Sequence, residues 1–167
     1  MAQAPAFLIT GMSGAGKSTI LAELDRRGHR VVDTDYDGWS VEEPEAGGGF
    51  RQLWREDRIA QLLRDHAEGP LFVSGTVENQ GRFYPRFAAV VLLTAPAEVL
   101  LARVAGRPGN AYGKSDRDRS LIAEHIRTVE PLLRATATAE IDTRRPVAEV
   151  ADLLEQIADA TSTGRSR

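Results

Sequence analysis

The sequence has no cysteine and no long hydrophobic run, and each absence excludes a class of protein. Without cysteine there are no disulfides and no thiolate chemistry. No stretch approaches the roughly 20 apolar residues of a membrane helix, and the N-terminus lacks a charged-then-apolar signal pattern. We therefore expect a cytoplasmic protein that makes no membrane contact.

Charge and aromatic content argue against nucleic acid as a partner. The 21 basic residues are balanced by 24 acidic ones, which gives a net charge of −3 and no basic stripe. Aromatic residues are only 6% of the chain, which is sparse for a base-stacking surface. The 167 residues suit one domain with a full-sized core. We expect a monomer or weak homodimer that acts on a small molecule.

The clearest motif is Gly-Met-Ser-Gly-Ala-Gly-Lys-Ser-Thr at 11–19, directly after the apolar stretch 6–10. It matches the Walker A phosphate loop, whose glycines let the backbone approach a phosphate at the N-terminus of a helix. Lys17 can reach the β- and γ-phosphates, and the Ser18 hydroxyl can ligate Mg²⁺. Lysine is rare in this chain, with Lys114 as the only other one, and a compact charge suits phosphate. The candidate nucleotide-binding residues are Gly11, Ser13, Gly14, Ala15, Gly16, Lys17, Ser18 and Thr19.

Apolar runs and helical periodicities alternate along the chain. We expect strands at 6–10, 29–32, 71–75, 88–94 and 139–142, and helices at 18–27, 50–66, 97–105, about 116–135 with a kink near Pro131, and 147–160. This alternation predicts an α/β fold, a three-layer sandwich in which helices cover both faces of a five-stranded parallel sheet. The expected single domain spans 1–167, with irregular, loop-like residues at 36–49, a substrate-binding insertion at about 36–70, a lid at about 106–118 and a disordered tail at 161–167.

Acidic residues follow only one of the central strands. The third expected strand ends in Ser74-Gly75 and the fourth in Thr94-Ala95-Pro96, whereas the second leads into Asp33-Thr34-Asp35. Many P-loop proteins carry their Mg²⁺-binding aspartate at a strand end, so here Asp33 and Asp35 must supply the carboxylates. There is no GTPase-type base-recognition motif, and the chain is short for a typical AAA module. These features favour a small kinase over a switch or a motor.

With these motifs the chain resembles the adenylate-kinase-like superfamily of small-molecule kinases, and it is most similar to shikimate kinase. The resemblance rests on the P-loop, Val-Asp-Thr-Asp at 32–35, Phe50-Arg51, Glu-Pro-Leu-Leu-Arg at 130–134 and Ile-Asp-Thr-Arg at 141–144. It implies a strand order of 2-3-1-4-5, with ATP and Mg²⁺ as cofactors. It also implies a role for each matching residue: Ser18 and Asp33 for Mg²⁺, Lys17, Asp35 and Arg107 for catalysis, Arg103, Arg144 and Pro146 around the adenine, and Arg51 and Arg134 on a substrate carboxylate.

The chain departs from the shikimate kinase pattern where the substrate binds. The family's three glycines after the third strand are replaced by Ser74-Gly75-Thr76-Val77-Glu78-Asn79-Gln80, and Trp54 stands where the family has an acidic residue. Gly75 and Glu78, together with Asp35, are candidate acceptor-site residues, while core packing is the expected role of Trp54. A different acceptor would explain these substitutions.

Three functions remain open at this point. The first is ATP-dependent transfer of the γ-phosphate to a hydroxyl of a small molecule. The second is a nucleoside or nucleoside-monophosphate kinase, in which Arg51, Arg82, Arg86 and Arg134 would bind the second phosphate. The third is an ATP-binding regulatory module without phosphotransfer.

Overall fold

Five parallel strands form the central sheet of the computed structural model, which describes residues 3–108 and 114–164. The strands are β1 (Ala6–Thr10), β2 (Arg30–Asp33), β5 (Leu71–Ser74), β6 (Ala89–Thr94) and β7 (Ala139–Asp142), in the order β2-β5-β1-β6-β7. They are the five predicted strands, so the predicted order 2-3-1-4-5 is confirmed. All residues of β1, β5 and β6 are buried, which explains their continuous apolar runs.

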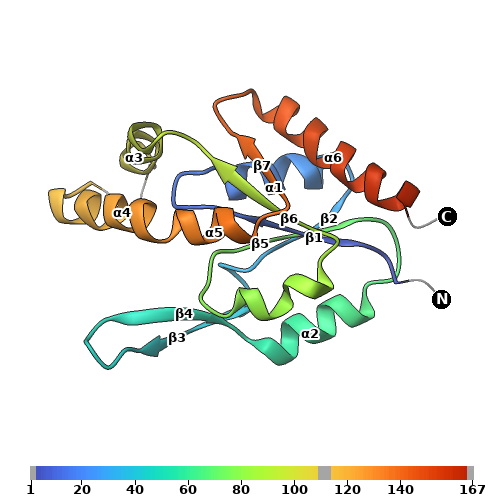
Figure 1. Cartoon of the computed structure of the whole chain (residues 1–167), viewed down its shortest axis with the longest axis horizontal. Coiled ribbons are helices and arrows are strands. Elements are labelled where there is room, and N and C mark those ends of the chain that lie inside the picture. Colours follow the sequence, from blue (N-terminus) through green and yellow to red (C-terminus); the bar gives the residue numbers. More distant parts are fainter. Residues whose placement is uncertain (1–2, 109–113, 165–167) are drawn as a thin grey trace.

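Helices cover both faces of this sheet (Figure 1), so the predicted three layers are confirmed. On one face, Phe7 and Ile9 of β1 pack in a core with α1 (Lys17–Arg26), α3 (Ala97–Ala105) and α6 (Val147–Gly164). On the other face, Leu8 packs in a second core with α2 (Glu56–Asp65) and the 3₁₀ helix η1 (Gln80–Arg86). Successive β1 residues thus enter opposite cores, as strand geometry requires. Within the described part of the chain, no helix has the length and apolar character that crossing a membrane demands.

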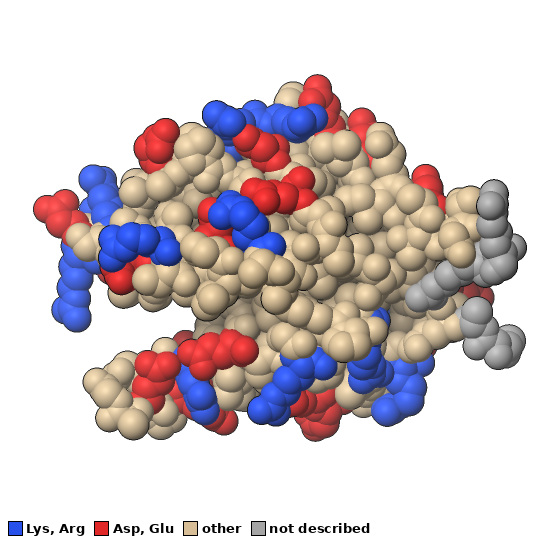
Figure 2. All heavy atoms as spheres, in the orientation of Figure 1, with Lys and Arg blue, Asp and Glu red and all other residues tan. Residues whose placement is uncertain are grey.

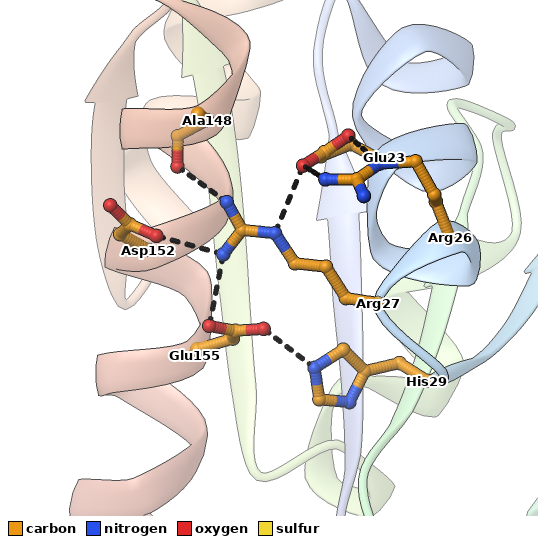
Figure 3. Close-up of polar contacts among 7 residues, drawn as sticks. All are labelled: Glu23, Arg26, Arg27, His29, Ala148, Asp152 and Glu155. Carbon is orange, nitrogen blue, oxygen red and sulfur yellow. Dashed lines mark hydrogen bonds and ion pairs between the residues drawn. The ribbon is translucent and has the colours of Figure 1, made fainter.

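The first and last helices are joined by an ion-pair network centred on Arg27 (Figure 3). Its guanidinium contacts Glu23 of α1 at 3.0 Å, and Asp152 and Glu155 of α6 at 2.8 and 3.0 Å. It also donates to the carbonyl of Ala148 at 3.1 Å. The network fixes α1, which begins at the phosphate loop, against the C-terminal helix.

Two features were expected in the C-terminal third of the chain, a helix kink and a disordered tail. Helix α4 (Asp116–Thr128) is separated from α5 (Glu130–Thr136) by Val129 alone, so the kink predicted near Pro131 is confirmed. The disordered tail was wrong for residues 161–164, because α6 continues to Gly164. The remaining tail residues, 165–167, and the lid residues 109–113 lie outside the described part.

The segment after β2 differs most from expectation. Residues 36–49 were expected to be irregular and 50–66 helical, but β3 (Ser40–Pro44) and β4 (Phe50–Trp54) form an antiparallel hairpin, and α2 begins only at Glu56. The hairpin loop is built by Gly48 and Gly49, whose φ angles of 89° and 87° favour glycine. Phe50 is 71% exposed, so it does not take the core position that helical spacing assigned to it.

Candidate active site

The phosphate loop between β1 and α1 has the backbone geometry that the motif predicts. Gly14 and Gly16 have φ angles of 83° and 100°, and a Cβ on Gly14 would lie 2.6 Å from the carbonyl oxygen of Leu100. Gly16 caps α1 without a side-chain hydrogen bond, so the first N–H groups of the helix stay available. The loop thus offers backbone donors and a helix N-terminus to an anion.

A cavity of about 410 Å³ opens at this loop. It joins segments that are far apart in the sequence: the loop itself, the turn after β2 and the residues after α3. Its lining consists of Ser13, Gly14, Gly16, Lys17, Ser18, Thr19, Asp35, Tyr36, Arg107 and Pro108. The cavity therefore brings together the three predicted catalytic residues, Lys17, Asp35 and Arg107. Tyr36 was not predicted, because nothing in its sequence position distinguishes it from a solvated turn residue.

Lys17 is anchored to the backbone of its own loop. Its ammonium donates to the carbonyl of Gly11 at 2.6 Å and to that of Met12 at 3.3 Å, which leaves one N–H for a ligand. Burial lowers the pKa of Lys17 to about 8. Asp35 opposes this lowering, and the positive charge of Arg107 adds to it. A phosphate in the cavity would restore the charged form.

Ser18 and Asp33 form the candidate Mg²⁺ site. The Ser18 hydroxyl donates to a carboxylate oxygen of Asp33 at 2.9 Å. Ser74 lies opposite Asp33 in the β2–β5 register, and its buried hydroxyl has no hydrogen-bond partner among the residues that the structure describes. Mg²⁺ prefers oxygen ligands and uses few from the protein, so these donors fit the ion. Among the described residues no group of three or more acids or histidines converges, so phosphates and water would have to complete the coordination.

Asp35 is the carboxylate that faces the cavity. Its backbone N–H donates to the Asp33 carboxylate at 3.1 Å, which orders the turn between them. Burial raises the pKa of Asp35, and the negative charge of Asp33 raises it further, while Lys17 and Arg107 lower it. A raised pKa makes a carboxylate a better proton acceptor.

The residues predicted around the adenine have structural partners instead. Arg103 donates to the carbonyl of Gly14 at 3.1 Å, and to the hydroxyl and carbonyl of Thr143 at 2.9 and 2.7 Å. It thereby ties the phosphate loop to the segment after β7. Arg144 is paired with Asp142 at 2.6 Å and is largely exposed. Pro146 accepts the first hydrogen bonds of α6, and the adenine role of these residues stays a prediction.

The two arginines predicted to share a substrate carboxylate are not brought together by their described contacts. Arg51 on β4 pairs with Glu43 and Glu78 at 3.2 and 3.5 Å. Arg134 on α5 pairs with two other acids, Glu130 and Glu140, at 3.0 and 3.2 Å. Each guanidinium is thus engaged by carboxylates of this chain, and a shared substrate carboxylate stays a prediction.

Arg51 and Glu78 line a second cavity of about 370 Å³, together with Leu53, Glu56, Asn79, Gly81 and Arg82. It shares no lining residue with the cavity at the phosphate loop. Figure 2 shows a hollow between the β3–β4 hairpin and the body of the molecule above it. Trp54, at the end of β4, is 2% exposed and packs against Phe83 and Phe87, which confirms its expected core role.

The comparisons with known proteins agree with this fold. A family model described as an AAA domain matches residues 8–124, although the chain is shorter than we expected of a typical AAA module. No curated protein matches the sequence significantly.

Among solved structures, shikimate kinase from Acinetobacter baumannii in complex with shikimate is 19% identical, covers 98% of this chain and 96% of its own, and has a TM-score of 0.63. A gluconokinase from Sinorhizobium meliloti 1021 is 21% identical, with 96% and 93% covered and a TM-score of 0.58. A sugar kinase from Janibacter sp. HTCC2649 is 19% identical, with 93% and 95% covered and a TM-score of 0.55. At these identities the likeness establishes a common fold. Because the family model covers well over half of its length, the chain belongs to this AAA domain family of P-loop proteins, with the fold of shikimate kinase and gluconokinase.

Proposed function

We propose that this protein is an ATP- and Mg²⁺-dependent phosphotransferase that moves the γ-phosphate to a hydroxyl of a small molecule. The observation that carries the proposal is that Lys17, Asp35 and Arg107 line one and the same cavity at the phosphate loop. Phosphoryl transfer needs little more than positioning, charge neutralisation and one carboxylate near the attacking oxygen. The lining of this cavity offers two cationic side chains and one carboxylate for these tasks, which supports the proposal.

The reaction follows from the roles of these side chains. Lys17 binds the β- and γ-phosphates, and Arg107 neutralises charge on the phosphoryl group in flight. The acceptor oxygen forms a bond to the γ-phosphorus while the bond to the ADP oxygen breaks, and Asp35 takes the hydroxyl proton. Mg²⁺ held through Ser18 and Asp33 would neutralise the phosphate oxygens. ADP and the phosphorylated acceptor then leave, and Asp35 returns its proton to water.

A nucleoside-monophosphate kinase has less support. The arginines considered for a second phosphate already have partners: besides the pairs of Arg51 and Arg134, Arg82 is bound to Glu56 at 2.9 Å and Arg86 to a backbone carbonyl at 3.1 Å. None of these four lines the cavity at the phosphate loop. A regulatory module without transfer would not require Asp35 in that cavity.

The test is acceptor-dependent ADP formation with a panel of shikimate, gluconate, neutral hexoses, nucleosides and nucleoside monophosphates. For the accepted compound, Asp35→Asn should lower kcat by about 10²- to 10⁴-fold and leave ATP affinity unchanged. Asp37→Asn is the matched control. Asp37 has φ 59°, a conformation that asparagine tolerates, and its carboxylate is outside the cavity, so activity should be retained.

Each alternative has its own outcome. Turnover confined to nucleoside monophosphates would assign the protein to that class of kinase. Tight ATP binding without any acceptor-dependent turnover would favour the regulatory module. Full transfer by Asp35→Asn would exclude Asp35 as the base.

A further inference from the structure

Thr34 lies between Asp33 and Asp35, but its side chain does not line the cavity. It is fully buried. Its N–H and its hydroxyl both donate to the carbonyl of Ser74 at the end of β5, at 3.1 and 2.7 Å. Thr34 therefore ties the turn that carries both carboxylates to the strand beside it.

The base of the β3–β4 hairpin is held by the same residue. The indole N–H of Trp54 donates to the Thr34 hydroxyl oxygen at 2.9 Å, and the Ser40 hydroxyl donates to the Thr34 carbonyl at 2.8 Å. Ser40 is the first residue of β3 and Trp54 the last of β4, and the two are paired across the hairpin. The first residue of β3 and the last residue of β4 are thus both hydrogen-bonded to Thr34.

The direction of each of these hydrogen bonds is fixed. An indole nitrogen can only donate, so the Thr34 oxygen accepts from Trp54 and gives its single proton to the Ser74 carbonyl. Gly75 leaves the space that this pair occupies, because a Cβ there would lie 2.4 Å from the Thr34 hydroxyl oxygen and 3.1 Å from the Trp54 nitrogen. A methyl group in place of the hydroxyl would leave the buried indole N–H without a partner.

We propose that Thr34 is a positioning residue, through which the hairpin and the end of β5 hold the turn that carries Asp33 and Asp35. An acceptor bound against the hairpin would then change the position of the Asp35 carboxylate. The inference rests on the proposed function for its catalytic consequence, while the coupling itself can be measured without catalysis.

The kinetic test compares Thr34→Val with Thr34→Ser, which keeps the hydroxyl. Displacing the Asp35 carboxylate from the acceptor hydroxyl should slow phosphoryl transfer. Thr34→Val should therefore lower kcat by about 10- to 100-fold, while the KM for ATP stays within about threefold. Thr34→Ser should recover most of the activity. Thr138→Val is the matched control, since its hydroxyl bridges the N–H and carbonyl of Val90 away from the site, and it should keep full activity. An unchanged kcat in Thr34→Val, or an equal loss in Thr138→Val, would overturn the proposal.

The second test reads the coupling directly. The chain has two tryptophans, Trp39 and Trp54, so indole N–H signals in ¹⁵N NMR can be assigned with Trp54→Phe. Mg²⁺-ATP should disturb the Ser18–Asp33 contact, and in the native protein the Trp54 signal should move with it. In Thr34→Val this response should be lost.

The outcomes of the NMR test separate the two ideas. A Trp54 signal that ignores Mg²⁺-ATP in the native protein, or that moves equally in Thr34→Val, contradicts the coupling. A Trp54 response in a protein that phosphorylates no acceptor would support the coupling and refute the proposed function. Should Thr34→Val fail to fold, Trp54→Phe breaks the same hydrogen bond from the other side and should lower kcat likewise.

Discussion

The ammonium of Lys17 should make nucleotide binding depend on pH. Burial holds its pKa at about 8, below the ordinary value of 10.5, although Asp35 and Asp33 oppose this lowering. Phosphates stabilise the charged form, so the protonated free protein is the form that binds ATP well. Affinity should therefore be constant at low pH and should fall as the pH rises through about 8.

The size of the effect follows from the fraction of protein that is charged. With a pKa of about 8, the ammonium is present in about nine tenths of the free protein at pH 7 and about one tenth at pH 9. ATP affinity should thus fall about tenfold over this interval, or about 1.4 kcal/mol. A lysine with the ordinary pKa would stay charged throughout, and affinity would hardly change.

The measurement is calorimetric titration with Mg²⁺-ATP from pH 6.5 to 9.5 at constant ionic strength. Lys17→Arg keeps its charge over this range, so its weaker binding should not vary with pH. Lys114→Arg changes the only other lysine, which is exposed, and should keep the native pH profile. A native affinity that is equal at pH 7 and pH 9 would refute the assignment of a lowered pKa to Lys17.

Three further substitutions test the supports of the site. Arg27→Met removes three contacts to α6 and one to Glu23 of α1, and it should lower the melting temperature by about 2–4 °C in calorimetry; an unchanged value would make the network neutral. Arg103→Leu leaves the Gly14 carbonyl without its donor and should weaken ATP binding about tenfold in the same titration, whereas native affinity would exclude a role in shaping the loop. Gly75→Ala places a Cβ 2.4 Å from the Thr34 oxygen and should lower the free energy of unfolding in urea by about 1–3 kcal/mol; native stability would show that the turn can relax.

The sheet and the phosphate loop could be predicted from the sequence because both are local patterns. β1, β5 and β6 are buried on both faces, so each is a short apolar run whose boundaries are visible in the sequence. The loop glycines have positive φ angles, which the spacing of the motif already predicts. Asp35 and Lys17 meet because parallel strands deliver their carboxyl ends to one edge, which is a property of the topology.

The hairpin could not be predicted in the same way, because what stabilises it is remote in sequence. Its strand β3 is mostly exposed and acidic, and β4 has an apolar spacing that also fits a helix continuing into α2. The choice is made by the buried indole of Trp54, which packs on Phe83 and Phe87 and binds Thr34. None of these partners can be identified from periodicity.

The arginines mark a second limit, which bears on the acceptor. The resemblance placed Arg51 and Arg134 on one substrate carboxylate, yet each lies against two glutamates of this chain. A long, flexible side chain takes whatever acid the tertiary structure brings near, and such exposed pairs contribute little free energy. An anionic acceptor must nonetheless displace Glu43 and Glu78 from Arg51, whereas a neutral polyol need not. Comparing gluconate with a neutral hexose in the acceptor panel therefore tests whether Arg51 binds substrate. A strong preference for gluconate that Arg51→Ala abolishes would assign Arg51 that role. Equal turnover of the two compounds would show that Arg51 serves only its ion pairs with Glu43 and Glu78.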